Sequence, residues 1–142
     1  MTDDDSETRA AFLQTHALAA ARVSKTIGLR LSVHGISLNE YLILDYLASQ
    51  RDRGVPRIEL AGHMGLSASG VTRLVAPMEK THLVEREAHA RDARQSLVRL
   101  TDAGARVHRE AQDTFVATAD ELTRGLQPED LQRAIRIFET IR

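Results

Sequence analysis

The stretch from Gly65 to Lys80 constrains the fold most, because it combines a glycine turn, a helix cap and a helix with two distinct faces. Ser67 predicts the helix start, since a serine hydroxyl accepts hydrogen bonds from the free backbone N–H groups of a first turn. Apolar residues then recur at intervals of three and four, which places them on one face: Val71, Leu74, Val75 and Met78. The opposite face carries small, hydroxyl and basic residues: Ser69, Thr72, Arg73, Ala76 and Lys80.

This outer face has the chemistry that a helix in the DNA major groove requires. Small residues allow close approach, hydroxyls donate to phosphates or base edges, and arginine bonds guanine or phosphate bidentately. Upstream, residues 58–64 predict a short helix ended by Gly65, which completes the order of a helix-turn-helix. Taken alone, the pattern also suits an ordinary amphipathic helix whose outer face is solvated.

Composition limits the function classes that remain. The length of 142 residues predicts a single domain. No apolar stretch approaches the roughly 20 residues that span a membrane, the first ten residues lack the features of a signal peptide, and we expect a cytoplasmic protein. The absence of cysteine excludes disulfides and cysteine-based zinc sites. Net charge is −1 overall, but residues 67–99 carry six basic and four acidic side chains, so any DNA contact must be a local patch.

Helices are predicted on the N-terminal side of this stretch. Residues 8–31 predict one long helix behind an acidic, frayed start, and its apolar stripe is too extensive for the surface of a small monomer. Ser37 and Glu40 form a capping box that opens a buried helix over residues 38–49. Residues 51–56 predict a polar loop.

A hairpin and two helices are predicted on the C-terminal side. Residues 83–87 and 96–100 alternate in polarity, as paired strands do, and a long basic loop joins them. A helix-turn-helix followed by such a hairpin is a winged helix. Thr101 caps a helix that ends near Arg124, and Pro128 stands near the start of a final apolar-striped helix.

The predicted fold is therefore mainly α with a small β-hairpin wing. It comprises a winged helix-turn-helix lobe over about residues 55–100 and dimerisation helices over about 8–31 and 102–142, all within one domain, 1–142. We expect the chain to form a homodimer, because its terminal helices carry more apolar surface than a monomer of this size leaves exposed.

The sequence resembles the MarR family of transcriptional regulators along nearly its whole length. The resemblance rests on short segments in a fixed order: Leu60-Ala61, Gly65-Leu66-Ser67, Val71 to Val75, Leu83 to Arg86, Asp92-Ala93-Arg94 and Val98 to Gly104. Each segment alone is weak, whereas their order and spacing are specific.

The resemblance implies a homodimer that binds a pseudopalindromic DNA operator, as a repressor released by a small-molecule effector. The predicted DNA-contacting residues are Ser67, Ser69, Gly70, Thr72, Arg73, Arg91 and Arg94. Arg94 would enter the minor groove, with Asp92 supporting it from the wing. The effector, such as a small aromatic acid, would bind where the dimerisation helices meet the lobe, near Arg30, His34 and Tyr41. An open alternative is that Tyr41 belongs to the core and the other two are solvated.

Departures from the family pattern leave a second function open. Pro77 stands where the family usually has a basic residue, His82 where it usually has glycine, and Ala93 where the wing usually has arginine. Pro77 removes a helical N–H and predicts a kink. The loss of possible phosphate contacts leaves open a winged-helix interaction module with weakened or lost DNA binding.

Catalysis, metals and cofactors have no support in the sequence. The six histidines show no zinc-type spacing, which leaves open only that His63 and His108 converge in space. None of the common nucleophile or phosphate-loop motifs occurs. We therefore predict a protein without enzymatic activity, metal or cofactor.

Overall fold

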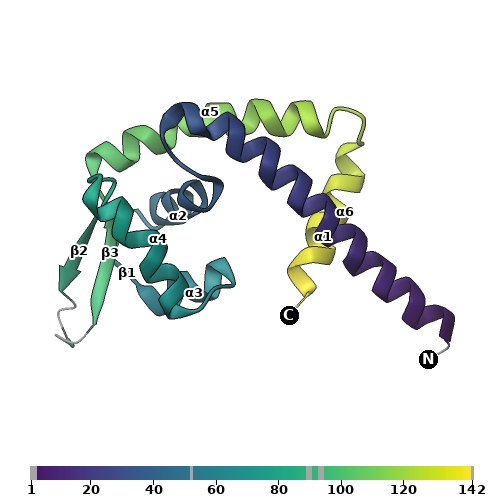
Figure 1. Cartoon of the computed structure of the whole chain (residues 1–142), viewed down its shortest axis with the longest axis horizontal. Helices are drawn as coiled ribbons and strands as arrows, with labels where there is room; N and C mark the ends of the chain where they lie inside the picture. The colour runs from purple at the N-terminus through teal and green to yellow at the C-terminus, as the bar shows by residue number, and fades with distance from the viewer. Residues whose placement is uncertain (1–2, 52, 89–90, 93–94, 142) are drawn as a thin grey trace.

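The computed structural model describes residues 3–51, 53–88, 91–92 and 95–141 and places them in a helical fold with one small sheet (Figure 1). The helices are α1 (Asp3–Leu31), the 3-10 helix η1 (Ser32–His34), α2 (Leu38–Ser49), α3 (Arg57–Met64), α4 (Ala68–Lys80), α5 (Asp102–Leu122) and α6 (Pro128–Thr140). The strands are β1 (Val55–Pro56), β2 (Val84–Ala88) and β3 (Ser96–Leu100). The fold class predicted from the sequence is confirmed.

The molecule has a lobe at one end and helices that extend from it (Figure 1). The lobe contains α3, α4 and the sheet, with α2 beside them. α1 and α5 run away from the lobe, and α6 folds back from the far end of α5, so that both termini lie away from the sheet (Figure 1). Among the helices of the described ranges, none combines the length and apolar character needed to cross a lipid bilayer.

The helix boundaries follow the predicted caps. Ser37 accepts a hydrogen bond from the Glu40 backbone N–H at 3.2 Å, and the Glu40 carboxylate accepts one from the Ser37 N–H at 3.4 Å. Thr101 caps α5 in the same way, since its hydroxyl accepts from the Gly104 N–H at 2.9 Å. Satisfied N–H groups at these ends stabilise the first helical turns.

α1 is longer than predicted, because it begins at Asp3 rather than near Thr8. The acidic residues at its start, expected to fray, are helical. Carboxylates near a helix N-terminus interact favourably with the partial positive charge there. Among the α1 residues whose burial is described, 4–31, only Ile27 and Leu31 are buried, whereas the earlier apolar residues are exposed.

The sheet has three antiparallel strands in the order β1-β3-β2. β1 corrects the prediction of a polar loop at 51–56, because Val55 pairs with Val98 and Pro56 pairs with Leu97. The predicted start of β2 at Leu83 is also one residue early. Leu83 donates its N–H to Met78, so it still belongs to the turn that ends α4.

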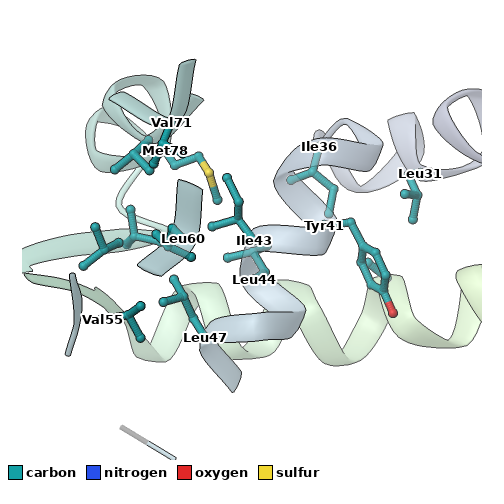
Figure 2. Packing of buried hydrophobic residues seen from close by; sticks show 14 of the residues in the cluster. Leu31, Ile36, Tyr41, Ile43, Leu44, Leu47, Val55, Leu60, Val71 and Met78 are labelled. Carbon is teal, nitrogen blue, oxygen red and sulfur yellow. The ribbon is translucent and has the colours of Figure 1, made fainter. Parts of the chain in front are cut away.

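The hydrophobic core lies around α2, whose Ile43, Leu44 and Leu47 meet α3, α4 and β1 (Figure 2). Leu60 of α3 and Met78 of α4 lie within this cluster (Figure 2). The nearly unbroken apolar run in α2 is thus explained by a helix that is packed from several sides. The core fixes α4 with its apolar face inward and its polar face outward.

Candidate nucleic-acid interface

α4 presents a polar outer face. Val71, Val75 and Met78 on its inner face are almost completely buried. Ser69, Thr72 and Arg73 on the outer face are exposed, and Gly70 is half-buried. The two faces therefore separate as the spacing of the residues predicts.

The turn before α4 places this face at the start of a helix. Gly65 ends α3 with a φ of +62°, a left-handed conformation that favours glycine. Ser67 then caps α4, because its hydroxyl accepts from the Gly70 N–H at 3.1 Å. Ser67 thus has a structural role, and its exposed position leaves the rest of its surface accessible.

Arg73 and Lys80 are exposed cations on α4, and within the described ranges neither forms an ion pair or a side-chain hydrogen bond. A guanidinium with no internal acceptor has its donors free for phosphate or guanine. Pro77 is also exposed, and α4 remains helical through it to Lys80.

Arg57, at the start of α3, is a residue that the sequence did not single out. Its Nη1 lies 3.5 Å from Thr72 Oγ1, and its Nη2 lies 3.3 Å from Glu79 Oε1. Glu79 also pairs with Arg86 of β2 at 3.2 Å. The Arg57 contacts join residues 15 and 22 positions apart, so no local pattern in the sequence predicts them.

The wing is formed by β2 and β3. Arg99 and Glu87 pair across the two strands at 2.6 Å. Beyond the strands, Arg91 is exposed and Asp92 is half-buried. Arg94 and Ala93 lie outside the described residues, so the predicted contact of Arg94 and its support by Asp92 stay predictions.

The three predicted effector residues all contact α5. Arg30 pairs with Glu121 at 3.0 Å, and His34 Nε2 lies 2.7 Å from Thr114 Oγ1. Tyr41 is buried with its ring beside α5 (Figure 2), and its ring centroid lies 4.7 Å from that of Phe115. Burial, and secondarily the charge of Asp45, raise the Tyr41 pKa above its ordinary value.

Tyr41 therefore belongs to the core, which was the open alternative at that position. Arg30, which is exposed, and His34, which is half-buried, each make one polar contact with α5. The three residues come from α1, η1 and α2, each of which packs against α5.

Several histidines have partners that explain them without a metal. His108 Nε2 lies 2.8 Å from Asp45 Oδ1, and the His63 ring lies 4.0 Å from the Tyr46 ring. In the part of the chain that the structure describes, no group of three or more His, Asp or Glu side chains is arranged to hold a metal ion.

Comparison with known families decides the class of this winged helix. The model of the MarR family matches residues 34–95, which include α2, α3, α4 and strand β2 of the wing. Residues 34–95 belong to the MarR family. Among curated proteins, no sequence match to the chain was found.

Solved structures extend the MarR-family fold beyond residues 34–95 in both directions. BldR from Sulfolobus solfataricus is 24% identical with a TM-score of 0.83, and the alignment covers 99% of this chain and 100% of that one. CouR from Rhodococcus jostii RHA1, bound to p-coumaroyl-CoA, is 21% identical with a TM-score of 0.81 over 92% of this chain and 89% of that one. MosR from M. tuberculosis, in complex with DNA, is 22% identical with a TM-score of 0.76 over 89% of this chain and 91% of that one.

Proposed function

We propose that this chain is a homodimeric, DNA-binding repressor that places α4 in the major groove of a pseudopalindromic operator. The observation that carries the proposal is the outer face of α4, where Ser69, Thr72 and Arg73 are exposed on a helix whose other face is buried. MosR, a transcriptional regulator whose fold this chain shares, was solved with DNA, which supports the same role for this chain.

The proposed contacts divide by chemistry. Thr72 and Arg73 would reach base edges, and Gly70 allows the helix to approach closely. Ser67, Ser69 and Arg91 would donate to phosphates, which position the protein without reading sequence. Arg94 is proposed for the minor groove, supported by Asp92, as the family pattern suggests.

Dimerisation would bring two α4 helices to one operator. Large apolar side chains are exposed along the terminal helices, which supports an interface there: Phe12, Leu13, Leu18, Val23, Ile135, Ile137, Phe138 and Ile141. An apolar groove lined by residues of α1 and α6 lies between these helices. A patch of this extent marks an interaction surface rather than a face in contact with water.

A small organic acid is proposed as the effector. Its carboxylate would compete with Glu121 for Arg30 and with Thr114 for His34, and both competitors lie on α5. Because α5 also belongs to the proposed dimer interface, loss of these contacts would let the lobe move relative to the dimer and separate the two α4 helices. CouR, whose fold this chain shares, was solved with p-coumaroyl-CoA, a thioester of an aromatic acid, which supports the aromatic part of the proposed effector and leaves its carboxylate as the part to be tested.

Gel shifts on the chain's own upstream DNA, repeated over a range of salt concentrations, test DNA binding. We expect sequence-specific binding with a steep salt dependence. Arg73→Lys is the matched variant, because it keeps the charge but removes the bidentate fork. We expect it to retain the salt slope and lose sequence preference. Absence of binding at low salt would favour the alternative of an interaction module, to which Pro77 and Ala93 point.

Calorimetry with salicylate-like acids tests the effector site. We expect Arg30→Gln and His34→Gln to weaken binding, whereas Tyr41→Phe reports whether the buried hydroxyl takes part. Binding that is unchanged in all three variants would move the effector to another site.

A further inference from the structure

Glu79 of α4 lies where this helix meets α3 and β2. Its Oε1 lies 3.3 Å from Arg57 Nη2 of α3, and its Oε2 lies 3.2 Å from Arg86 Nη2 of β2. The Glu79 side chain is 24% exposed and that of Arg57 is 23% exposed. One half-buried carboxylate thus holds two arginines that come from the elements on either side of α4.

Arg57 continues this set of contacts to the proposed DNA face. Its Nη1 lies 3.5 Å from the hydroxyl oxygen of Thr72, a residue of the outer face. Its Nε is buried and has no hydrogen-bond partner in the described structure. The contacts therefore run from Thr72 through Arg57 and Glu79 to Arg86 on the wing strand.

We propose that Glu79 is a specificity-determining positioning residue, which restrains Arg57 and Arg86 from binding phosphate and fixes Thr72 on the reading face. This inference rests on the proposed function, since it concerns how the α4 surface discriminates among DNA sequences. Phosphate contacts add affinity to every sequence alike, whereas base contacts distinguish them. A carboxylate that restrains two cations beside the reading face lowers the affinity for non-specific DNA. Base contacts then account for a larger share of the affinity for the operator.

Glu79→Gln tests the proposal, because it keeps the size of the side chain and removes its charge. With the carboxylate gone, Arg57 and Arg86 are free to bind phosphate. We expect affinity for random-sequence duplex to rise and its salt slope to steepen by about 0.9 to 1.8, one counterion for each arginine released. The ratio of operator to random-sequence affinity is expected to fall by roughly tenfold, because Thr72 loses its restraint.

Glu85→Gln is the matched control. It removes the same charge from the same lobe, but Glu85 is exposed on β2 and holds neither arginine. Both variants remove one negative charge from the lobe, so the difference between them reports the released arginines. A Glu79→Gln variant that matches Glu85→Gln in slope and in affinity ratio would overturn the proposal.

Arg86→Gln keeps the test decisive if Glu79→Gln does not fold, as a melting curve would show. An arginine held by Glu79 makes no phosphate contact, so we expect the salt slope of Arg86→Gln to equal that of the unmodified chain. A loss of about 0.9 in slope would overturn the proposal. Glu79→Gln is expected to steepen the salt slope, and adding Arg86→Gln to it is expected to reverse this steepening by about one counterion. A merely structural role of Glu79 would not produce this reversal.

The same experiments separate this inference from the proposed function. If the unmodified chain binds no DNA, the proposed function fails and the inference fails with it. The inference alone fails under a different pair of results: the unmodified chain binds its operator and Arg73→Lys loses sequence preference, but Glu79→Gln behaves as Glu85→Gln does.

Discussion

Gly104, in the first turn of α5, allows this helix to pack closely against Leu83 because glycine has no Cβ. A Cβ at this position would collide with the backbone carbonyl oxygen of Leu83, which also accepts a hydrogen bond from the Thr101 hydroxyl at 3.0 Å. Gly104→Ala is therefore expected to cost about 1–3 kcal/mol of unfolding free energy through overpacking. Gly62→Ala is the control, because nothing lies within 4 Å of its added Cβ. It is expected to stabilise α3 by about 0.5–1 kcal/mol, and chemical denaturation of both variants gives the comparison.

Glu59 gives the lobe a dependence on pH. Hydrogen bonds from Arg53, and then from Tyr46, hold the pKa of its carboxyl below the ordinary value. A lowered folded-state pKa means that the stabilisation is complete above the ordinary carboxyl pKa and is lost as the pH falls through the folded-state value.

Denaturant unfolding of the unmodified chain and of Glu59→Gln across this pH range measures the effect. We expect the unmodified chain to be the more stable at pH 7, and the difference in unfolding free energy to shrink as the solution is acidified. A difference that stays constant down to the acid limit would show that the Glu59 charge contributes nothing.

At the scale of elements, Pro77 is the main irregularity in α4. It has no N–H to donate to the Arg73 carbonyl, and it stands on the exposed side of the helix. We predict that it bends the end of α4 away from the DNA and confines base contacts to the first two turns. Pro77→Ala is expected to restore the hydrogen bond, and Pro77→Arg to add a phosphate contact as well.

Both Pro77 variants are expected to bind the operator more tightly, and Pro77→Arg alone to steepen the salt slope, by about one counterion. Melting temperatures distinguish the competing explanation. If the bend allows Met78 and Leu83 to pack, both variants lose stability. Weaker DNA binding with an unchanged melting temperature would contradict a bend away from the groove.

Local signals in the sequence predicted the helices and their caps well. The Ser37 capping box, the Ser67 cap and the Gly65 turn all depend on residues within four positions of one another, so the sequence displays them directly. The two-residue strand β1 has no such signal. Its pairing with β3 is a contact between residues more than 40 positions apart, and proline is an uncommon strand residue.

The candidate site was also predictable only where it depends on residues close in the sequence. The outer face of α4 follows from helical periodicity, whereas the Arg57 and Glu79 contacts depend on how α3 and α4 cross. Tyr41 illustrates a further limit. Its type suits a ligand pocket or a core equally, and only the packing of α5 against α2 places it in the core.

At the scale of the whole molecule, the exposed apolar surface of the terminal helices predicts a dimer. Ile135 of α6 is 56% exposed, and Phe138 stacks against Phe12 of α1 with ring centroids 6.1 Å apart. Ile135→Glu would bury a charge in the proposed interface, so we expect it to shift the chain to monomers and to lower operator affinity. Gln132→Glu on the polar side of α6 adds the same charge as a control. Sedimentation at micromolar concentration measures both, and a folded, monomeric unmodified chain would contradict the dimer.

We propose above that two α4 helices read one operator through its major groove. Methylation of guanine N7, which lies in the major groove, tests this directly in an interference experiment on the selected operator. We expect two clusters of interfering guanines about one DNA turn, roughly 34 Å, apart. Arg73→Ala is expected to weaken binding by about 1–3 kcal/mol and to remove the interference at its own guanine in both clusters. Tight, sequence-specific binding without N7 interference, or interference that Arg73→Ala leaves unchanged, would contradict the claim.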